Sequence, residues 1–309
     1  MAWKKLGMVF DLSQHKLDWI KSHAMLPTPL VLEDRIRVYY TYRDANGLSR
    51  ISFVDLDPTD PRNILYVHQG SLFDIGKPGT FDDSGVLGNF ALRKDGKVYL
   101  FYNGYNRRVV VPWSNAIGVA ESDDGGTTFR KMYEGPIFDR DAKEPYFSIT
   151  PWMLEENGLW HIWYTSGTGW VKKGEIYEPL YVVKYATTQN GLDWNRHYLT
   201  CIPPKTPEEA NARAAVVKDG NQYKMWLCYR GSDAFRDGAD SYRIGYATAT
   251  TPTDWTRDDE QAGIAPGPEE YDDKMQAYPA VVDAGGKRYL FYNGNGFGYY
   301  GFCCAEFVE

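Results

Sequence analysis

The stretch YPAVVDAGGKRYLFYNGNGFG, residues 278–298, decides the fold because four upstream stretches repeat its pattern. The earlier copies begin at Thr28, Asn89, Thr150 and Arg213. Successive copies therefore start 61, 61, 63 and 65 residues apart. Each copy joins an apolar run to a run rich in aromatic and β-branched residues through a short polar turn, such as Lys94-Asp95-Gly96. Alternation on both sides of a turn predicts a β-hairpin in every copy.

A third strand follows every hairpin, and a fourth strand is visible in three copies. The third strand has an alignable small residue in every copy, at Val54, Ala120, Ala186, Ala247 and Ala305. A fourth strand begins at an aromatic residue in three copies, at Phe129, Trp194 and Trp255. Four antiparallel strands repeated five times predict an all-β fold, a five-bladed β-propeller. The repeat covers the chain without a linker, so we expect one domain spanning residues 1–309.

The first residues of the chain supply the strand that the last copy lacks. The fifth copy stops after its third strand, whereas residues 3–11 match residues 129–139 of the second copy, where the fourth strand begins. We therefore expect the N-terminal strand to complete the last blade, which pairs the two ends of the ring and removes an exposed sheet edge.

Composition excludes several classes of function. A net charge of −7 argues against a nucleic-acid partner and against adsorption to a membrane surface. No apolar run long enough to span a membrane and no signal peptide are visible, so we expect a cytoplasmic protein. Four cysteines without a CxxC pair and five scattered histidines predict reduced packing cysteines and no metal site of His or Cys ligands. The sequence implies no required cofactor; a structural calcium ion in the axial channel is an open alternative. The oligomeric state has no sequence signal.

One turn indicates which face of the ring carries the short turns and which carries the longer loops. Residues 122–129, SDDGGTTF, fit an Asp box, which we interpret as a structural turn between strands three and four. The opposite face then receives the loops that lead into each first strand and the loops that leave each second strand. In a ring these loops surround one central mouth.

The expected mouth is rich in carboxylates, arginines, asparagines and aromatic residues. Acidic residues precede four of the five copies, and carboxylates in different surroundings can divide into an acid and a base. The aromatic residues expected to stack on sugar rings are Tyr105, Trp113, Trp170, Phe235, Phe297 and Tyr299. The residues expected to bind substrate are His23, Arg43, Asp44, Asp82, Asn89, Trp170, Arg213, Arg230, Tyr278 and Asn293.

The chain resembles the five-bladed β-propeller glycosidases, glycoside hydrolase families 43, 32 and 130. The resemblance rests on the fivefold repeat, on YTYRDANGLSRI at 40–51, on FDDSGVLGNFALRKDGKVYLFYNG at 81–104 and on the third-strand pattern IGYAT. It implies catalytic carboxylates at the starts of inner strands. The sequence departs from families 43 and 32 near Thr28, where LPTPLVL holds no carboxylate. The YRD and SRI phrases look more like family 130, whose members include phosphorylases, and Arg43, Arg213 and Arg230 are then candidates to hold phosphate.

Two functions follow as expectations. The first is a glycoside hydrolase that acts through paired carboxylates at the mouth, with Asp83 and Glu209 as the leading pair and Glu144 and Asp273 as the next candidates. The second is a carbohydrate-binding propeller without catalysis, or an accessory domain in glycan assembly, which needs the aromatic residues and arginines but no carboxylate pair. Carbohydrate is the expected partner in both.

Overall fold

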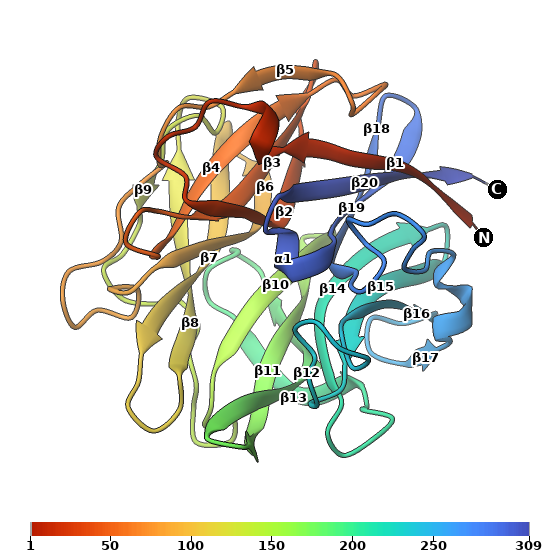
Figure 1. Cartoon of the computed structure of the whole chain (residues 1–309). Coiled ribbons are helices and arrows are strands. Elements are labelled where there is room, and N and C mark those ends of the chain that lie inside the picture. The colour runs from red at the N-terminus through yellow and green to blue at the C-terminus, as the bar shows by residue number, and fades with distance from the viewer. Residues whose placement is uncertain (1, 309) are drawn as a thin grey trace.

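A computed structural model describes residues 2–308, which form five four-stranded antiparallel sheets arranged in a ring (Figure 1). Each sheet is one blade, and the blades follow the order of the repeat along the chain. The first strands of neighbouring blades contact one another in succession, and the first strand of blade 5 returns to that of blade 1. The predicted five-bladed β-propeller is therefore confirmed.

Every blade contains four strands. Blade 1 consists of β2 (Ser22–Val31), β3 (Ile36–Arg43), β4 (Ser49–Leu56) and β5 (Ile64–Val67). Blade 2 consists of β6 (Val86–Lys94), β7 (Lys97–Arg107), β8 (Trp113–Ser122) and β9 (Arg130–Lys131). Blade 3 consists of β10 (Ser148–Glu156), β11 (Leu159–Lys173), β12 (Ile176–Thr188) and β13 (Asn195–Ile202). Blade 4 consists of β14 (Ala210–Asp219), β15 (Gln222–Arg230), β16 (Arg243–Ala249) and β17 (Trp255–Arg257). Blade 5 consists of β18 (Ala277–Ala284), β19 (Lys287–Asn293), β20 (Gly301–Val308) and β1 (Ala2–Asp11).

Within residues 2–308, helical structure is confined to three short turns, η1 (Leu12–Gln14), η2 (Asp259–Ala262) and α1 (Asn295–Gly298). None of the helices in this described part of the chain has the length and apolar character needed to cross a bilayer. All four cysteines are buried and free, as the sequence predicted.

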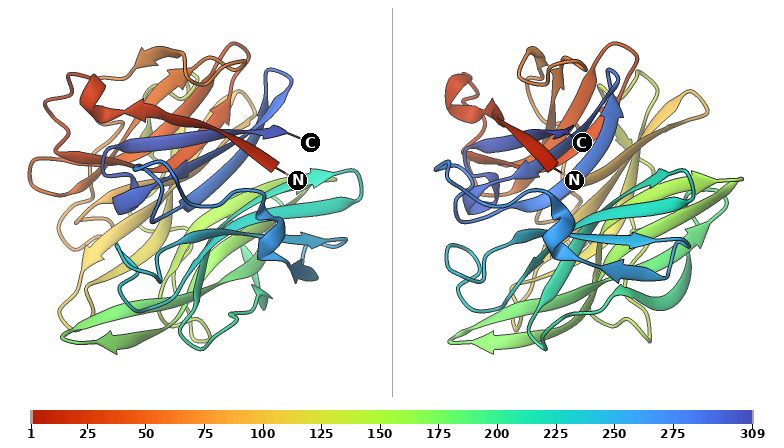
Figure 2. Two further views of the ribbon diagram at one scale, coloured as in Figure 1. Left: turned by 45° about the vertical axis from the view of Figure 1, so that its right-hand side comes forward. Right: turned by 90° about the vertical axis from the view of Figure 1, so that its right-hand side faces the viewer.

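The N-terminal strand closes the ring. β1 pairs antiparallel with β20, from Ala2 opposite Val308 to Asp11 opposite Gly301. The two strands lie side by side in both views of the ribbon (Figure 2). This pairing makes β1 the fourth strand of blade 5, as the sequence predicted, and covers the edge that β20 would otherwise expose.

Aromatic pairs connect the blades at a repeated position. In four blades the aromatic residue at the start of the fourth strand packs on an aromatic residue in the second strand of the preceding blade. The ring centroids are 5.6 Å apart in Tyr39–Phe129, 5.9 Å in Phe101–Trp194, 6.0 Å in Trp163–Trp255 and 5.3 Å in Trp226–Trp3. Such pairs contribute about 0.5–1.5 kcal/mol each beyond the area they bury. β5 has Leu65 at this position, with 52% of its surface exposed, so the junction of blades 5 and 1 is built differently.

The Asp-box turn at residues 122–129 joins β8 to β9 and also contacts blade 1. Asp124 Oδ1 accepts hydrogen bonds from the backbone N–H groups of Thr127 and Thr128, both at 3.0 Å. The hydroxyl of Tyr39 donates to the carbonyl of Gly126 at 2.9 Å. The carboxylate thus fixes its own turn, and the turn fixes a neighbouring blade.

Candidate functional site

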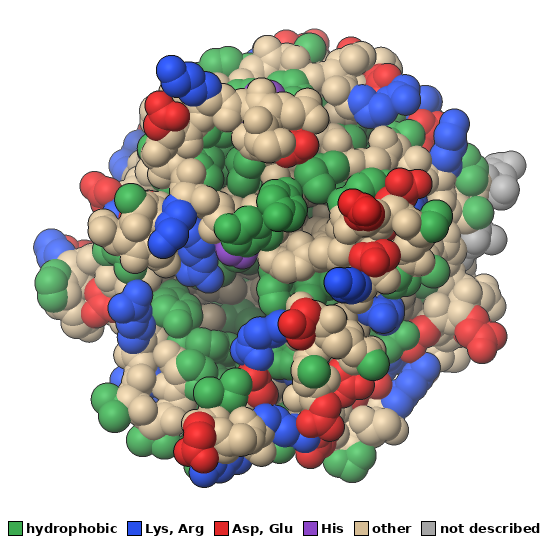
Figure 3. Space-filling view, in the orientation of Figure 1, with side chains coloured by type: hydrophobic (Ala, Val, Ile, Leu, Met, Phe, Trp, Pro, Cys, Tyr) green, Lys and Arg blue, Asp and Glu red, His purple; other side chains and the backbone are tan. Residues whose placement is uncertain are grey.

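A pocket of about 300 Å³ lies where the first strands begin and the second strands end. All five blades contribute to it. Its lining residues are His23, Met25, Leu26 and Arg43 from blade 1, Leu87, Asn103, Tyr105, Trp113 and Asn115 from blade 2, Ile149, Thr150, Pro179 and Tyr181 from blade 3, Ala212, Arg230, Phe235, Arg236 and Tyr242 from blade 4, and Tyr278 and Phe297 from blade 5. Figure 3 shows the hollow, with apolar and basic side chains around it. None of these lining residues is an aspartate or a glutamate.

A β-bulge interrupts the first strand of every blade beside this pocket. The bulged residue pairs are Leu26-Pro27, Gly88-Asn89, Thr150-Pro151, Arg213-Ala214 and Tyr278-Pro279. The first residue of each pair other than Gly88 has a φ between 45° and 57°, which is uncommon for residues with a side chain. Bulges redirect side chains, and Leu26, Thr150 and Tyr278 line the pocket.

The strand register corrects the alignment of the first two copies. Leu26 and Gly88, rather than Thr28 and Asn89, occupy the position of Thr150. The hairpins of blades 1 and 3 match without a gap, because Tyr40 follows Leu26 by 14 positions and Tyr164 follows Thr150 by 14 positions. The match between the two Thr-Pro pairs in the sequence was therefore wrong by two residues, because Pro27 and not Pro29 is equivalent to Pro151.

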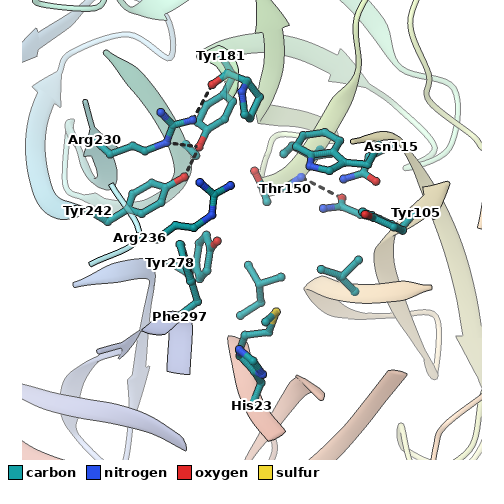
Figure 4. A pocket seen from close by; sticks show the side chains of 18 of the residues that line it. His23, Tyr105, Asn115, Thr150, Tyr181, Arg230, Arg236, Tyr242, Tyr278 and Phe297 are labelled. Atoms are coloured by element: carbon teal, nitrogen blue, oxygen red, sulfur yellow. Dashed lines mark hydrogen bonds between the residues drawn. The ribbon is translucent and has the colours of Figure 1, made fainter. Parts of the chain in front are cut away.

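A hydrogen-bonded cluster forms one wall of the pocket (Figure 4). Arg230 donates from Nε to the hydroxyl of Tyr181 at 3.2 Å and from Nη2 to the carbonyl of Pro179 at 2.6 Å. The hydroxyls of Tyr181 and Tyr242 bond to each other, and the Arg230 guanidinium stacks 3.9 Å above the ring of Phe235. Burial raises the pKa of the Tyr242 hydroxyl far above its usual value, so this phenol stays protonated at neutral pH.

The opposite wall holds His23 and Arg43. The Nδ1 atom of His23 lies 2.7 Å from the hydroxyl of Ser22, and Arg43 donates from Nη1 to the hydroxyl of Ser49 at 2.5 Å. Burial, and then the positive charge of Arg43, lower the pKa of His23 from 6.5 to about 4. His23 is therefore neutral at pH 7, and Arg43 carries the positive charge of this wall.

Arg213 lies fully buried below the pocket. It donates from Nη2 to the carbonyl of Pro27 at 2.9 Å and to the hydroxyl of Thr28 at 3.3 Å, and from Nη1 to Asn89 at 3.4 Å. Its Nε has no hydrogen-bond partner within the described chain. Burial lowers the pKa of Arg213 to about 10, which leaves the guanidinium charged at neutral pH.

The predicted substrate-binding residues divide into three groups. His23, Arg43, Arg230 and Tyr278 line the pocket. Asn89, Arg213 and Asn293 are buried behind the lining, where Asn293 accepts the N–H of Leu26 at 2.7 Å, and Trp170 packs on Trp113 with ring centroids 4.9 Å apart. Asp44 and Asp82 are outside the lining, because Asp44 accepts the N–H groups of its own turn and Asp82 is held inside blade 2.

Of the predicted stacking residues, Tyr105, Trp113, Phe235 and Phe297 line the pocket. Trp170 and Tyr299 do not. No sequence signal pointed to Tyr181, Tyr242 or Asn115, which lie within or just before third strands. Their contribution to the pocket depends on where the third strand of each blade starts, and blade lengths differ too much for the repeat to predict it.

The acidic residues before the first strands form a second, repeated arrangement. Asp82, Glu144, Glu209 and Asp272 are buried, and each pairs with a basic residue of the fourth strand of its own blade. These bases are Lys131, Arg196, Arg257 and Lys5. In three blades a second-strand tyrosine also donates to the carboxylate, Tyr102 at 3.2 Å, Tyr164 at 2.9 Å and Tyr292 at 2.9 Å. Blade 1 has Val67 in place of the base. We call these contacts the acid–base ties.

The four predicted catalytic carboxylates are not brought together in the pocket. Glu144 and Glu209 belong to the acid–base ties, and Glu144 also pairs with Lys184 at 3.0 Å. Asp83 accepts from the N–H of Gly79 at 2.9 Å, and Asp273 accepts from the amide of Asn295 at 2.6 Å. Asp82 and Asp272, the residues before these two aspartates, occupy the repeated position.

Once the register is known, spacing from the bulge separates the members of these pairs. Asp82, Glu144 and Asp272 each precede the bulged residue of their blade by six positions, and Glu209 precedes Arg213 by four. Within residues 2–308, no group of three or more His, Cys, Asp or Glu side chains is placed to hold a metal ion. The axial calcium ion stays a prediction.

Comparisons with known proteins give one family and one shared fold. No family model matches the chain. Among solved structures it is similar to a glycoside hydrolase, with a TM-score of 0.76 and 14% identity over 99% of this chain and 92% of the other. It is also similar to a thermostable family-43 glycoside hydrolase, with a TM-score of 0.66 and 16% identity over 93% of this chain and 91% of the other. The resemblance to the five-bladed propeller glycosidases is thus confirmed for the fold.

The sequence relatives are closer. The chain is 35% identical over 308 residues to two proteins of Mycobacterium tuberculosis, the uncharacterized protein MT1551 of strain CDC 1551 and the uncharacterized protein Rv1502 of strain H37Rv. The match covers 99% of this chain and 99% of each relative. With end-to-end similarity at this level, the chain belongs to the Rv1502 family of five-bladed β-propellers.

Proposed function

We propose that the chain binds a carbohydrate in the mouth pocket and that this pocket does not hydrolyse it through a carboxylate pair. The observation that carries the proposal is the lining itself: it combines aromatic rings, arginines and amides from five blades and includes no aspartate or glutamate. Hydrolysis by the usual mechanism requires two carboxyl groups that flank the scissile bond.

The composition of the lining suits sugar recognition. Tyr105, Trp113 and Phe297 are half-buried, so part of each ring is open to a ligand. Aromatic faces of this kind pack on the apolar face of a sugar ring, while a few fixed polar groups orient its hydroxyls. Asn115 and Thr150 are the uncharged polar candidates for that role.

The experiment is a glycan array, followed by calorimetry on the strongest ligands and by chromatography of the same ligands after several days with the protein. We expect binding with the ligand recovered intact. Tyr105→Ala should weaken binding about tenfold or more, since a well-packed aromatic contact contributes about 1–3 kcal/mol. The matched control is Tyr133→Ala, which removes an exposed tyrosine of the same blade that is not part of the pocket lining. Equal loss in both variants would contradict the pocket assignment.

A glycoside hydrolase is the second candidate, favoured by the names of the solved structures that share the fold. In this hypothesis Asp83, Glu209, Glu144 and Asp273 keep their predicted catalytic roles. Asp83→Asn and Glu209→Gln should then abolish cleavage of an aryl-glycoside panel while the circular dichroism spectrum stays native. Cleavage by the unmodified protein that both variants lose would replace the binding proposal with this one.

A further inference from the structure

Three arginines at the propeller mouth have no anionic partner. Within residues 2–308, Arg43, Arg213 and Arg230 form no ion pair with a carboxylate. Arginines elsewhere whose side chains are less than 10% exposed do have such partners, because Arg37 pairs with Asp55 and Arg196 pairs with Glu144. This local excess of positive charge occurs in a chain whose net charge is −7.

The neighbouring charged groups do not balance these arginines. Arg236 lines the pocket but already pairs with Glu178, to which it donates from both terminal nitrogens. His23 is neutral at pH 7 because its pKa is lowered to about 4. The pocket and the space below it therefore hold an excess of positive charge from Arg43, Arg230 and Arg213.

Burying arginines without anionic partners costs free energy in the protein without a ligand. A guanidinium taken out of water loses hydration, and neutral acceptors such as the carbonyls of Pro179 and Pro27 compensate for only part of that loss. An anion that enters the pocket offsets the cost, and it gains charge-assisted hydrogen bonds that are about twice as strong as neutral ones.

Arg43 has the donors to hold that anion. A guanidinium has five N–H groups, and within residues 2–308 the Arg43 side chain donates one hydrogen bond, to the hydroxyl of Ser49. Arg230 uses most of its donors on Pro179, Tyr181, Gly231 and Ser232. Arg43 therefore supplies directional hydrogen bonds, and Arg230, fixed on Phe235, supplies mainly positive potential.

We propose that the ligand of the mouth pocket is an acidic sugar, one that carries a carboxylate or a phosphate, that Arg43 binds its anionic group, and that Arg230 adds positive potential. The inference rests on the proposed function, which supplies the sugar ring, and deepens it by naming the class of sugar. Carboxylate and phosphate share the geometry that an arginine fork recognises, so the two sources are separated by experiment.

The test uses matched monosaccharides in the gluco, galacto and manno series, each as the neutral methyl glycoside, the methyl uronide and the 6-phosphate. Inorganic phosphate and acetate are added as anions without a sugar. Binding to the whole chain is measured by calorimetry at low and high sodium chloride. We expect one acidic form to bind at least about tenfold more tightly than its neutral partner, because a hydrogen bond to a charged group contributes about 1.5–3 kcal/mol. Its affinity should fall as salt rises.

The variant Arg43→Gln should reduce this preference about tenfold or more, and Arg43→Lys should restore only part of it, since lysine keeps the charge and loses the fork. Arg93→Gln is the matched control, because it removes an exposed arginine at the far end of β6, outside the pocket lining. An unchanged preference in Arg43→Gln would overturn the proposal. So would inorganic phosphate or acetate binding as tightly as the acidic sugar.

The two proposals fail in different ways. If neutral and acidic members of each pair bind equally well, sugar binding stands and the acidic-sugar inference is wrong. If the array and the monosaccharide panel both give no ligand of either class, the proposed carbohydrate function itself is wrong.

Discussion

The same tyrosine position has different surroundings in different blades. Tyr102, Tyr164 and Tyr292 donate their hydroxyls to the buried carboxylates of the acid–base ties. Tyr40 occupies this position in blade 1, where the strand register aligns it with Tyr102. Its hydroxyl is buried and has no hydrogen-bond partner within residues 2–308. One residue type thus stabilises three blades and leaves a buried polar group unsatisfied in a fourth.

This contrast predicts opposite effects of one substitution. Tyr292→Phe should lower the free energy of unfolding by about 1.5–3 kcal/mol, because it removes a hydrogen bond to a charged group inside the protein. Tyr40→Phe should leave stability unchanged or raise it, because it removes a hydroxyl that is buried without a partner. Urea denaturation of the two variants and the unmodified chain measures both effects. Equal destabilisation by the two substitutions would contradict the role assigned to the ties.

His23 predicts a pH effect. Its pKa is about 4 in the folded state and 6.5 in the absence of the fold, so the unfolded chain binds more protons between these values. His23 therefore reduces the free energy of unfolding as the pH falls from about 6.5 to about 4, and has no such effect above that range. His23→Gln should lose less stability between pH 7 and pH 5 than the unmodified chain, measured by urea midpoints. The exposed His197→Gln is the control, and identical pH slopes in all three proteins would contradict the prediction.

At the scale of elements, the sequence predicted what is local and repeated. Hairpins, third strands and the closing strand follow from alternating patterns and from matched residues such as Trp3 and Phe129. The register of β2 was not predictable from Thr28-Pro29, because Pro27 and Pro29 both offer a proline to match Pro151, and only the pairing with β3 shows that Pro27 is the equivalent one. The acid–base ties were not predicted, because a pair of adjacent aspartates such as Asp82 and Asp83 gives no local signal for which one turns inward.

The pairing of β1 with β20 gives a prediction for one glycine. A Cβ atom at Gly301 would overlap the carbonyl oxygen of Phe10, and that contact is to backbone, which cannot move aside without opening the strand pair. Gly301→Ala should therefore lower the melting temperature by several degrees, about 4 °C or more for a loss of roughly 2 kcal/mol in a chain of this size. Gly135→Ala is the control, because a Cβ there meets no atom within 4 Å. Equal melting temperatures would contradict the close packing of β1 against β20. Deletion of residues 1–10 should have a larger effect in the same direction.

At the scale of the whole molecule, opposite charges are separated between two sites. The acidic residues of the ties are buried inside the blades and neutralised by fourth-strand bases, whereas the unpaired arginines gather at the axis. The recurrence of acids in the sequence indicated a shared feature correctly. The position of these acidic residues could be determined only from the structure of the ring. The sequence does not show which side of each entering loop faces the fourth strand and which side faces the channel.

Ring closure leads to a prediction about where the chain can be opened. In the native order a strand from one end of the chain completes a blade made by the other end, so backbone hydrogen bonds as well as side chains join the ends. A first circular permutant joins Val308 to Ala2 through a loop of about four residues, a common hairpin length, and begins at Lys205, in the exposed loop between blades 3 and 4. Every blade is then contiguous, and only side-chain packing closes the ring.

A second permutant uses the same loop and begins at Asn190, in the exposed turn between β12 and β13. Here β13 becomes the N-terminal strand and completes blade 3 from the other end of the chain, as β1 does for blade 5 in the native order. Both permutants should fold, and the second should require a higher urea concentration to unfold, because the loss of its strand pairing must accompany opening of the ring. Equal urea midpoints for the two permutants would show that strand pairing across the ends contributes nothing beyond the packing of neighbouring blades.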